Sequence, residues 1–148
     1  MRAALPSVRS KATSILNQYG IASHDYVGEA KAIGHYVQQN VRYVKDANGV
    51  EQLTDPLTMI DQMGQGISRG DCDDMALLIA TLLLAIGHDP AFRCVRYDSF
   101  TGPFNHIYVV DYPVDQKLGK IRVVLDAIVK NQKIGFEVKH MSGSEYKA

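Results

Sequence analysis

Three residues have the types and the order needed for cysteine-nucleophile chemistry. Cys72 lies in the segment 70–74, with the sequence G-D-C-D-D, directly before a long apolar stretch. His106 lies within an alternating apolar segment, and Asp126 follows an apolar run. A histidine can accept the proton of a thiol and later give it to a leaving group, and a carboxylate behind the histidine fixes its tautomer. We therefore predict that Cys72, His106 and Asp126 form a catalytic triad.

The expected setting of Cys72 favours a reactive thiolate. The residues that follow are apolar almost all round as far as Ile86, and Gly87 can end a helix, which predicts a buried helix that begins near Asp71. Asp71 is expected to be its N-cap, with Asp74 as the capping-box partner. A helix N-terminus stabilises an anion, and its free N–H groups can bind the oxyanion that forms when a thiolate attacks a carbonyl.

The part of the chain after this helix has the apolar spacing of strands. Alternating apolar residues predict strands at 92–97, 104–111 and 121–125, with a connecting turn over 113–120. A further edge strand is expected at 134–138, and a loose polar tail at 141–148. Helices first and adjacent strands afterwards predict an α+β fold with an antiparallel sheet.

The part of the chain before Cys72 is expected to be mainly helical. Apolar spacing predicts a helix over 7–19 and a longer helix that is capped by Ser23. Asp55, which is followed by a proline, is expected to begin a third helix. A short extended piece is predicted at 41–44, and a turn is predicted at 46–49.

Composition and charge restrict the class of protein. A chain of 148 residues with 46% apolar and 22% charged residues is typical of one globular domain. Lys plus Arg and Asp plus Glu both number 16, and this zero net charge argues against nucleic acid and anionic membranes as partners. The longest apolar stretch, residues 75–86, is too short to span a bilayer, and the N-terminal residues lack the apolar core of a signal peptide. We therefore expect one soluble, cytoplasmic domain over residues 1–148.

Each candidate residue also has a structural explanation. A cysteine beside an apolar helix is usually a small buried residue, and a lone histidine in a strand is usually structural. The acidic segment 71–74 lacks the glycine and the closing glutamate of an EF-hand loop, so we predict no metal site. Cys94 is expected to be buried and inert, a disulfide with Cys72 being less favoured, and His88 is expected at the surface or in a cap. The order and placement of the three residues together favour the catalytic interpretation.

The motifs around these residues resemble those of the transglutaminase-like superfamily. The run G-D-C-D-D-M-A-L-L at 70–78, followed by A-I-G-H-D-P-A-F-R at 85–93, is similar to the core motif of that family. The segment N-H-I-Y-V at 105–109 and the strand end V-L-D at 124–126 resemble its second and third motifs.

The resemblance extends upstream of the core motif and covers about residues 27–128. The segment 33–43, with the pattern I-x-x-Y-V-x-x-N-V-x-Y, resembles the helix that precedes the core in bacterial members. The resemblance implies a papain-like α+β fold, a core with a buried cysteine-bearing helix packed on an antiparallel sheet. The helix at 7–19 and the tail at 139–148 are expected to lie outside this core. The triad of the family is carried over to Cys72, His106 and Asp126.

The resemblance also implies a reaction class. Active members of the superfamily attack an amide carbonyl through a thioester, and they include transglutaminases, cysteine peptidases and peptide N-glycanases. Animal transglutaminases carry a tryptophan that helps to bind the oxyanion, whereas this sequence has none. Gln62, Gln65 and the backbone of Cys72 are therefore the oxyanion-hole candidates. Tyr97 and Tyr108 are expected either to line the substrate cleft or to pack in the core, and we favour packing in the core.

The sequence leaves a choice between related activities. We favour peptidase-type hydrolysis slightly over transglutaminase cross-linking, with a protein or peptide substrate and no cofactor. The alternative is a non-catalytic binding or assembly protein on the same fold. This sequence resembles small bacterial and prophage-encoded members that lack additional domains. A virion-associated location, with phage structural proteins as partners, therefore stays open.

Overall fold

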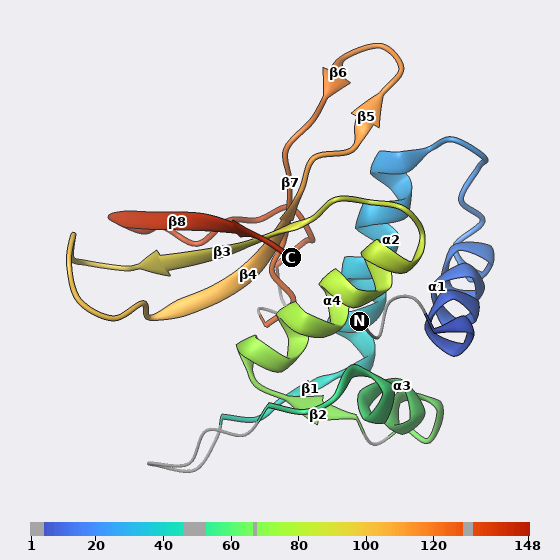
Figure 1. Ribbon diagram of the computed structural model, residues 1–148, viewed down its shortest axis with the longest axis horizontal. Coiled ribbons are helices and arrows are strands. Elements are labelled where there is room, and N and C mark those ends of the chain that lie inside the picture. The colour runs from blue at the N-terminus through green and yellow to red at the C-terminus, as the bar shows by residue number, and fades with distance from the viewer. Residues whose placement is uncertain (1–4, 46–52, 67, 129–131) are drawn as a thin grey trace.

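The structure has a helical part and a four-stranded antiparallel sheet, with helix α4 between them (Figure 1). It is a computed structural model that describes residues 5–45, 53–66, 68–128 and 132–148. This arrangement confirms the predicted α+β class. The elements follow the chain as α1 (Pro6–Gln18), α2 (Tyr26–Asn40), β1 (Arg42–Tyr43), α3 (Pro56–Gly64), β2 (Arg69–Gly70), α4 (Cys72–Ala85), β3 (Ala91–Arg96), β4 (His106–Asp111), β5 (Val114–Asp115), β6 (Gly119–Lys120), β7 (Val123–Leu125) and β8 (Ser142–Lys147).

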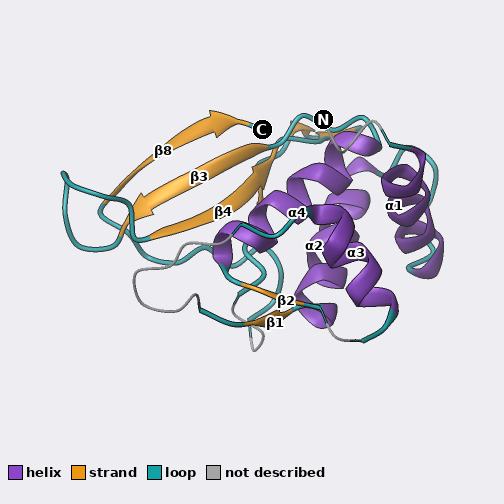
Figure 2. Cartoon of the chain, turned by 60° about the horizontal axis from the view of Figure 1, so that its bottom comes forward, coloured by secondary structure: helices purple, strands orange, loops and turns teal. Residues whose placement is uncertain are grey.

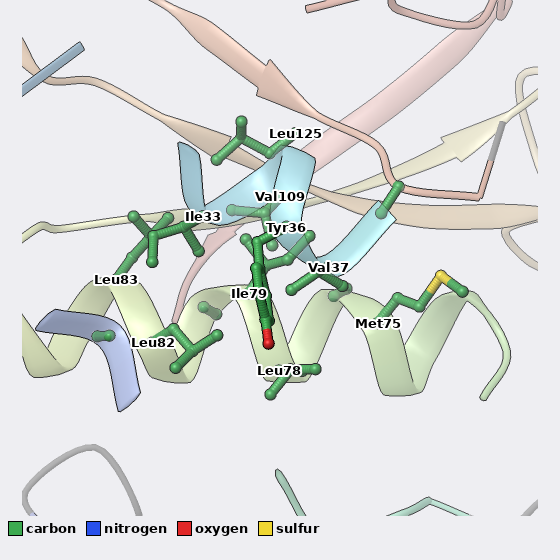
Figure 3. Close-up of a cluster of buried hydrophobic side chains, with 14 of the residues drawn as sticks. Ile33, Tyr36, Val37, Met75, Leu78, Ile79, Leu82, Leu83, Val109 and Leu125 are labelled. Carbon is green, nitrogen blue, oxygen red and sulfur yellow. The ribbon is translucent and has the colours of Figure 1, made fainter. Parts of the chain in front are cut away.

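Helix α4 contacts both parts of the fold. The other three helices pack on it from one side, and strand β4 packs on it from the other (Figure 2). Ile79 and Leu83 of α4 lie in one buried cluster with Ile33 of α2, Val109 of β4 and Leu125 of β7 (Figure 3). Full burial of such a side chain stabilises a fold by about 2 kcal/mol. This core therefore fixes the start of α4 relative to β4 and β7, the strands beside the other two predicted site residues.

Carboxylate caps determine where α3 and α4 begin. Asp71 Oδ1 accepts the Asp74 N–H at 3.1 Å, and Asp74 Oδ2 accepts the Asp71 N–H at 3.1 Å, which confirms the predicted capping box. Asp55 Oδ1 accepts the Leu57 N–H at 2.9 Å and caps α3, also as predicted. The first residue of α4 is therefore Cys72.

Helix α2 begins later than the sequence predicted. Its N-cap is Asp25 rather than Ser23, and Asp25 Oδ1 accepts the Gly28 N–H at 2.9 Å. A β-carbon at position 28 would lie 2.3 Å from Asp25 Oδ2, so the carboxylate reaches this position because Gly28 has no side chain. The predicted extended piece at 41–44 is confirmed as β1, which pairs in parallel with β2.

The main sheet has the strand order β7-β4-β3-β8, and all neighbouring strands are antiparallel. The three predicted strands correspond to β3, β4 and β7, with shorter limits for the last two. His106, the first residue of β4, is paired with Val95 of β3. Leu125, the last residue of β7, is paired with Val109 of β4, so Asp126 leaves the sheet directly beside β4.

The C-terminal segment differs from the prediction. Residues 141–148 are not a loose tail, because β8 pairs with the whole of β3. A β-carbon at Gly143 would lie 2.9 Å from the Cys94 carbonyl oxygen, so the glycine permits this close pairing. The segment 134–138 is not an edge strand, since Ile134 packs against the helical core instead.

The predicted turn over 113–120 contains the short hairpin β5–β6. The turn predicted at 46–49 lies outside the described residues. Within the part of the chain that the structure describes, none of the helices has the length and apolar character needed to cross a membrane.

Candidate active site

Cys72 lies at the N-terminus of α4, the position that the sequence predicted. Its side chain is partly exposed, and its Sγ lies 3.9 Å from Asp73 Oδ1. Asp74 Oδ1 accepts the Thr54 N–H at 2.6 Å, which attaches the segment before α3 to the first turn of α4. The first N–H groups of a helix have no partner within the helix, so the Cys72 N–H is available to an anion.

His106 and Asp126 form a buried pair at one end of the sheet. His106 Nε2 lies 2.7 Å from Asp126 Oδ2, and the two side chains are only 2% and 3% exposed. Asp126 Oδ1 accepts the Ile128 N–H at 3.4 Å, which orients the carboxylate. When the register of β4 and β7 is continued by one residue, Asp126 faces Tyr108, and His106 lies two residues away on the same face.

The Cys72 thiol is a neighbour of the His106 ring and contributes to the raised pKa of that histidine. Because Nε2 is hydrogen-bonded to Asp126, Nδ1 is the ring nitrogen left for an interaction with the thiol. Burial lowers the pKa of His106, but the hydrogen bonds with Asp126 and Cys72 outweigh burial and raise it from 6.5 to about 9. The ring is therefore a cation at neutral pH, held between a carboxylate and a sulfur that can carry negative charge.

Two tyrosine rings enclose the His106 ring. Tyr97 stacks on it with ring centroids 6.2 Å apart and an interplanar angle of 23°, and Tyr108 contacts it at 5.4 Å. Tyr108 is 1% exposed and packs in the core as expected, whereas Tyr97 is 44% exposed and covers the histidine from the solvent side. The Tyr97 N–H donates to Asn105 Oδ1 at 2.9 Å. Asn105 directly precedes His106 in the sequence, so this hydrogen bond holds Tyr97 beside the site.

A second buried histidine was missed by the sequence analysis. His88 was expected at the surface or in a cap, but its side chain is only 5% exposed. Its Nδ1 lies 2.6 Å from Asp111 Oδ2, and its Nε2 lies 2.7 Å from Glu29 Oε1. Burial lowers the pKa of His88, but these two carboxylates outweigh it and the net shift is upward. Glu29 is on α2 and Asp111 is on β4, so no local motif could have predicted the cluster.

The glutamines proposed as oxyanion donors lie at the end of α3. Gln65 is exposed, and its Nε2 donates to Asp61 Oδ2 at 3.2 Å within the same helical segment. Among the described residues, no side-chain hydrogen bond joins Gln62 or Gln65 to the candidate triad. Their role in an oxyanion hole stays a prediction, as does that of the Cys72 N–H.

Cys94 has a different environment from Cys72. It lies in β3, paired with Ile107 of β4 and Ser144 of β8, and it is half-buried rather than fully buried as expected. Burial raises the pKa of the Cys94 thiol, and the negative charge of Asp73 and Cys72 raises it further. Both cysteines are free thiols. The structure thus contains one cysteine beside a histidine and one in the interior of a sheet.

The comparisons with known proteins bear on the fold. No family model matches this sequence, and no curated protein matches it. Among solved structures, the chain is similar to the crystal structure of "a Putative Cysteine Protease from Cytophaga hutchinsonii", with a TM-score of 0.56 and 18% sequence identity. The match covers 90% of this chain and 40% of the length of that protein. The similarity is therefore one of fold, extends over nearly the whole of this chain, and agrees with a papain-like α+β arrangement.

Proposed function

We propose that this chain is a cysteine-nucleophile amide hydrolase or acyltransferase of the transglutaminase-like kind, with Cys72, His106 and Asp126 as its catalytic residues. One observation carries the proposal. The buried His106 ring has a carboxylate at Nε2, 2.7 Å away, and the thiol at the start of α4 is a neighbour that also raises its pKa. A histidine that is oriented by a carboxylate and faces a thiol can move a proton to and from a substrate.

The geometry supports a two-step reaction. The Cys72 thiolate attacks an amide carbonyl carbon, and the resulting oxyanion lies where the Cys72 N–H can donate to it. The His106 imidazolium gives its Nδ1 proton to the departing amine, the C–N bond breaks, and a thioester remains. His106 then accepts a proton from an attacking water or amine, which displaces the sulfur as a thiolate and gives an acid or a new amide. Asp126 keeps the ring oriented in both steps.

Peptidase-type hydrolysis of a protein or peptide substrate is the favoured form of this activity. Its support is the likeness in fold to a structure described as a cysteine protease candidate. Transfer of the acyl group to an amine uses the same thioester and the same residues. The cytoplasmic or virion-associated location and the phage partners stay predictions.

A single experiment tests the proposal and separates its two forms. The protein is incubated with a diverse peptide library in ¹⁸O-labelled water, with and without a fluorescent primary amine, and the products are identified by mass spectrometry. Hydrolysis adds one ¹⁸O to a new carboxyl end, whereas transfer attaches the fluorescent amine. Both products should be absent with the variant Cys72→Ala. If no peptide is changed in a Cys72-dependent manner, the chain is not an amide hydrolase or acyltransferase of this kind.

A further inference from the structure

The connection that leads from β3 to His106 is rich in exposed aromatic side chains. The connection between β3 and β4 carries three of them, Tyr97, Phe100 and Phe104, which are 44%, 72% and 37% exposed. Tyr97 stacks on the His106 ring, and Phe104 lies two residues before it. We call these three residues the aromatic rim. Large apolar side chains grouped on a surface next to reactive groups are typical of a binding site.

Contacts of Arg96 hold Phe104 and the turn that carries the aromatic rim. The Arg96 guanidinium lies 4.2 Å from the centroid of the Phe104 ring, and Arg96 Nε donates to the Gly102 carbonyl at 2.8 Å. Gly102 has a φ of +91°, a conformation that favours glycine and turns the chain here. Rings that are fixed but exposed can bind a side chain without the entropy cost of ordering a loop.

A second exposed surface lies on the other side of the thiol. Strand β2 leads directly to Cys72, and its partner β1 places Arg42 opposite Arg69. Both arginines are exposed, and within the described residues neither belongs to an ion pair. We call them the basic rim. Side chains at paired positions share one face of a sheet, so the two cations repel each other, and a bound carboxylate would relieve that repulsion.

The two rims lie on opposite sides of the nucleophile. Figure 1 shows the start of α4 between the free end of the sheet, where β3 turns into β4, and the β1–β2 pair. The turned view in Figure 2 shows the same arrangement. An extended ligand that contacts both rims would therefore run past the N-terminus of α4, which begins at Cys72. A polypeptide in an extended conformation, which advances by about 3.3 Å per residue, can do this over a few residues.

We infer that the site takes an extended polypeptide with a bulky apolar side chain on one side of the reacting amide and an acidic side chain on the other. This inference rests on the proposed function, because it names the substrate class of the same site. The apolar side chain contacts the aromatic rim, and the acidic side chain pairs with the basic rim. A second copy of this chain is the competing occupant of the aromatic rim.

Binding to the inactive variant Cys72→Ala tests the inference without any need for turnover. Each fluorescent peptide has a central glutamine with one variable residue on either side. One variable residue is apolar or, as a control, serine, and the other is acidic or, as a control, serine. Both orders along the peptide are tested. Anisotropy should show that loss of the apolar residue weakens binding by about tenfold. Loss of the acidic residue should weaken it by about two- to fivefold, and high salt should remove this second preference.

Matched surface variants in the Cys72→Ala background assign each preference to its rim. Phe100→Ser should remove the apolar preference, whereas Leu118→Ser, at a side chain that is 77% exposed on the β5–β6 hairpin, should not. Arg42→Gln and Arg69→Gln should remove the acidic preference, whereas Arg9→Gln on the exposed face of α1 should not. Circular dichroism of each variant confirms that it is folded.

The outcomes separate the two proposals. Equal binding of all peptides overturns the inference about the substrate, even if the active protein cleaves some of them. Sedimentation that shows a dimer lost in Phe100→Ser also overturns it, because the aromatic rim would then bind a second copy. Selective binding together with no Cys72-dependent turnover supports the binding surface but contradicts the proposed enzyme function.

Discussion

The His106 ring and the His88 ring are both buried near β4, and both are hydrogen-bonded to carboxylates. They differ in the group that neighbours the second ring nitrogen. His106 has Asp126 on Nε2 and the Cys72 thiol as its other neighbour. His88 has Asp111 on Nδ1 and Glu29 on Nε2. A ring with a carboxylate on each nitrogen has no nitrogen left for a substrate. Burial and a raised pKa therefore do not distinguish the two histidines, and the catalytic role proposed for His106 depends on its neighbour Cys72.

The two clusters also differ in what they connect. The cluster of His88, Glu29 and Asp111 joins α2 to β4 across the interior. The ring centroids of Tyr26 and His88 lie 6.2 Å apart. The pair of His106 with Asp126 lies at the free end of the sheet, beneath the exposed ring of Tyr97. The first cluster links two elements of the core, whereas the proposed function assigns the second to a ligand that approaches from solvent.

The largest expected effect separates the two histidines by turnover. On any peptide that the wild-type protein converts, Cys72→Ala should abolish turnover, and His106→Ala should lower kcat/KM by about four to six decades. His88→Gln should leave kcat/KM of the folded protein within about threefold, because no nitrogen of that ring faces the thiol. Comparable losses in His106→Ala and His88→Gln, measured per folded molecule, would remove the distinction between the clusters.

The carboxylates should show the same contrast at a smaller scale. Asp126→Asn should keep the fold and lower turnover by about two to four decades, because an amide no longer holds His106 in the required tautomer. Asp111→Asn should lower the free energy of unfolding, measured in urea, with little change in turnover. If Asp126→Asn unfolds the protein while activity per folded molecule is unchanged, Asp126 only ends a strand.

Stability against pH should report both histidines. The pKa of each is raised above the unfolded value of 6.5, so their stabilising effect is fully present below pH 6.5 and is lost as pH rises through the folded values, about 9 for His106. The free energy of unfolding should fall by about 2 kcal/mol for His106 alone between pH 6.5 and 8.5. His106→Gln and His88→Gln should each flatten this dependence. A wild-type curve that is flat over this range contradicts the raised pKa values.

Local chemistry allowed the sequence to predict much of the candidate site. Asp71 and Asp74 are three residues apart, so their capping box, and with it the position of Cys72, follows from spacing alone. The alternating residues around His106 and the strand end at Asp126 indicate the two strands in the same way. None of these inferences needs knowledge of a distant contact.

The features that the sequence did not predict depend on distant partners. His88 is buried because Glu29 and Asp111, far away in the sequence, lie on either side of it. Strand β8 has a polar sequence without strand periodicity, and it forms because its backbone pairs with β3, with Gly143 allowing the close approach. The Asp25 cap was missed because its fit depends on the missing side chain of Gly28.

Selective alkylation of the two cysteines tests the central claim most directly, since it requires no substrate. If the His106 cation supports a Cys72 thiolate, iodoacetamide at pH 6 should modify Cys72 at least about tenfold faster than Cys94 in the native protein. The variant His106→Ala should lose this selectivity, His88→Gln should keep it, and urea should abolish it in the wild type. Equal and slow modification of both native cysteines at pH 6, rising together towards pH 9, would show that Cys72 is an ordinary thiol and would contradict the catalytic account.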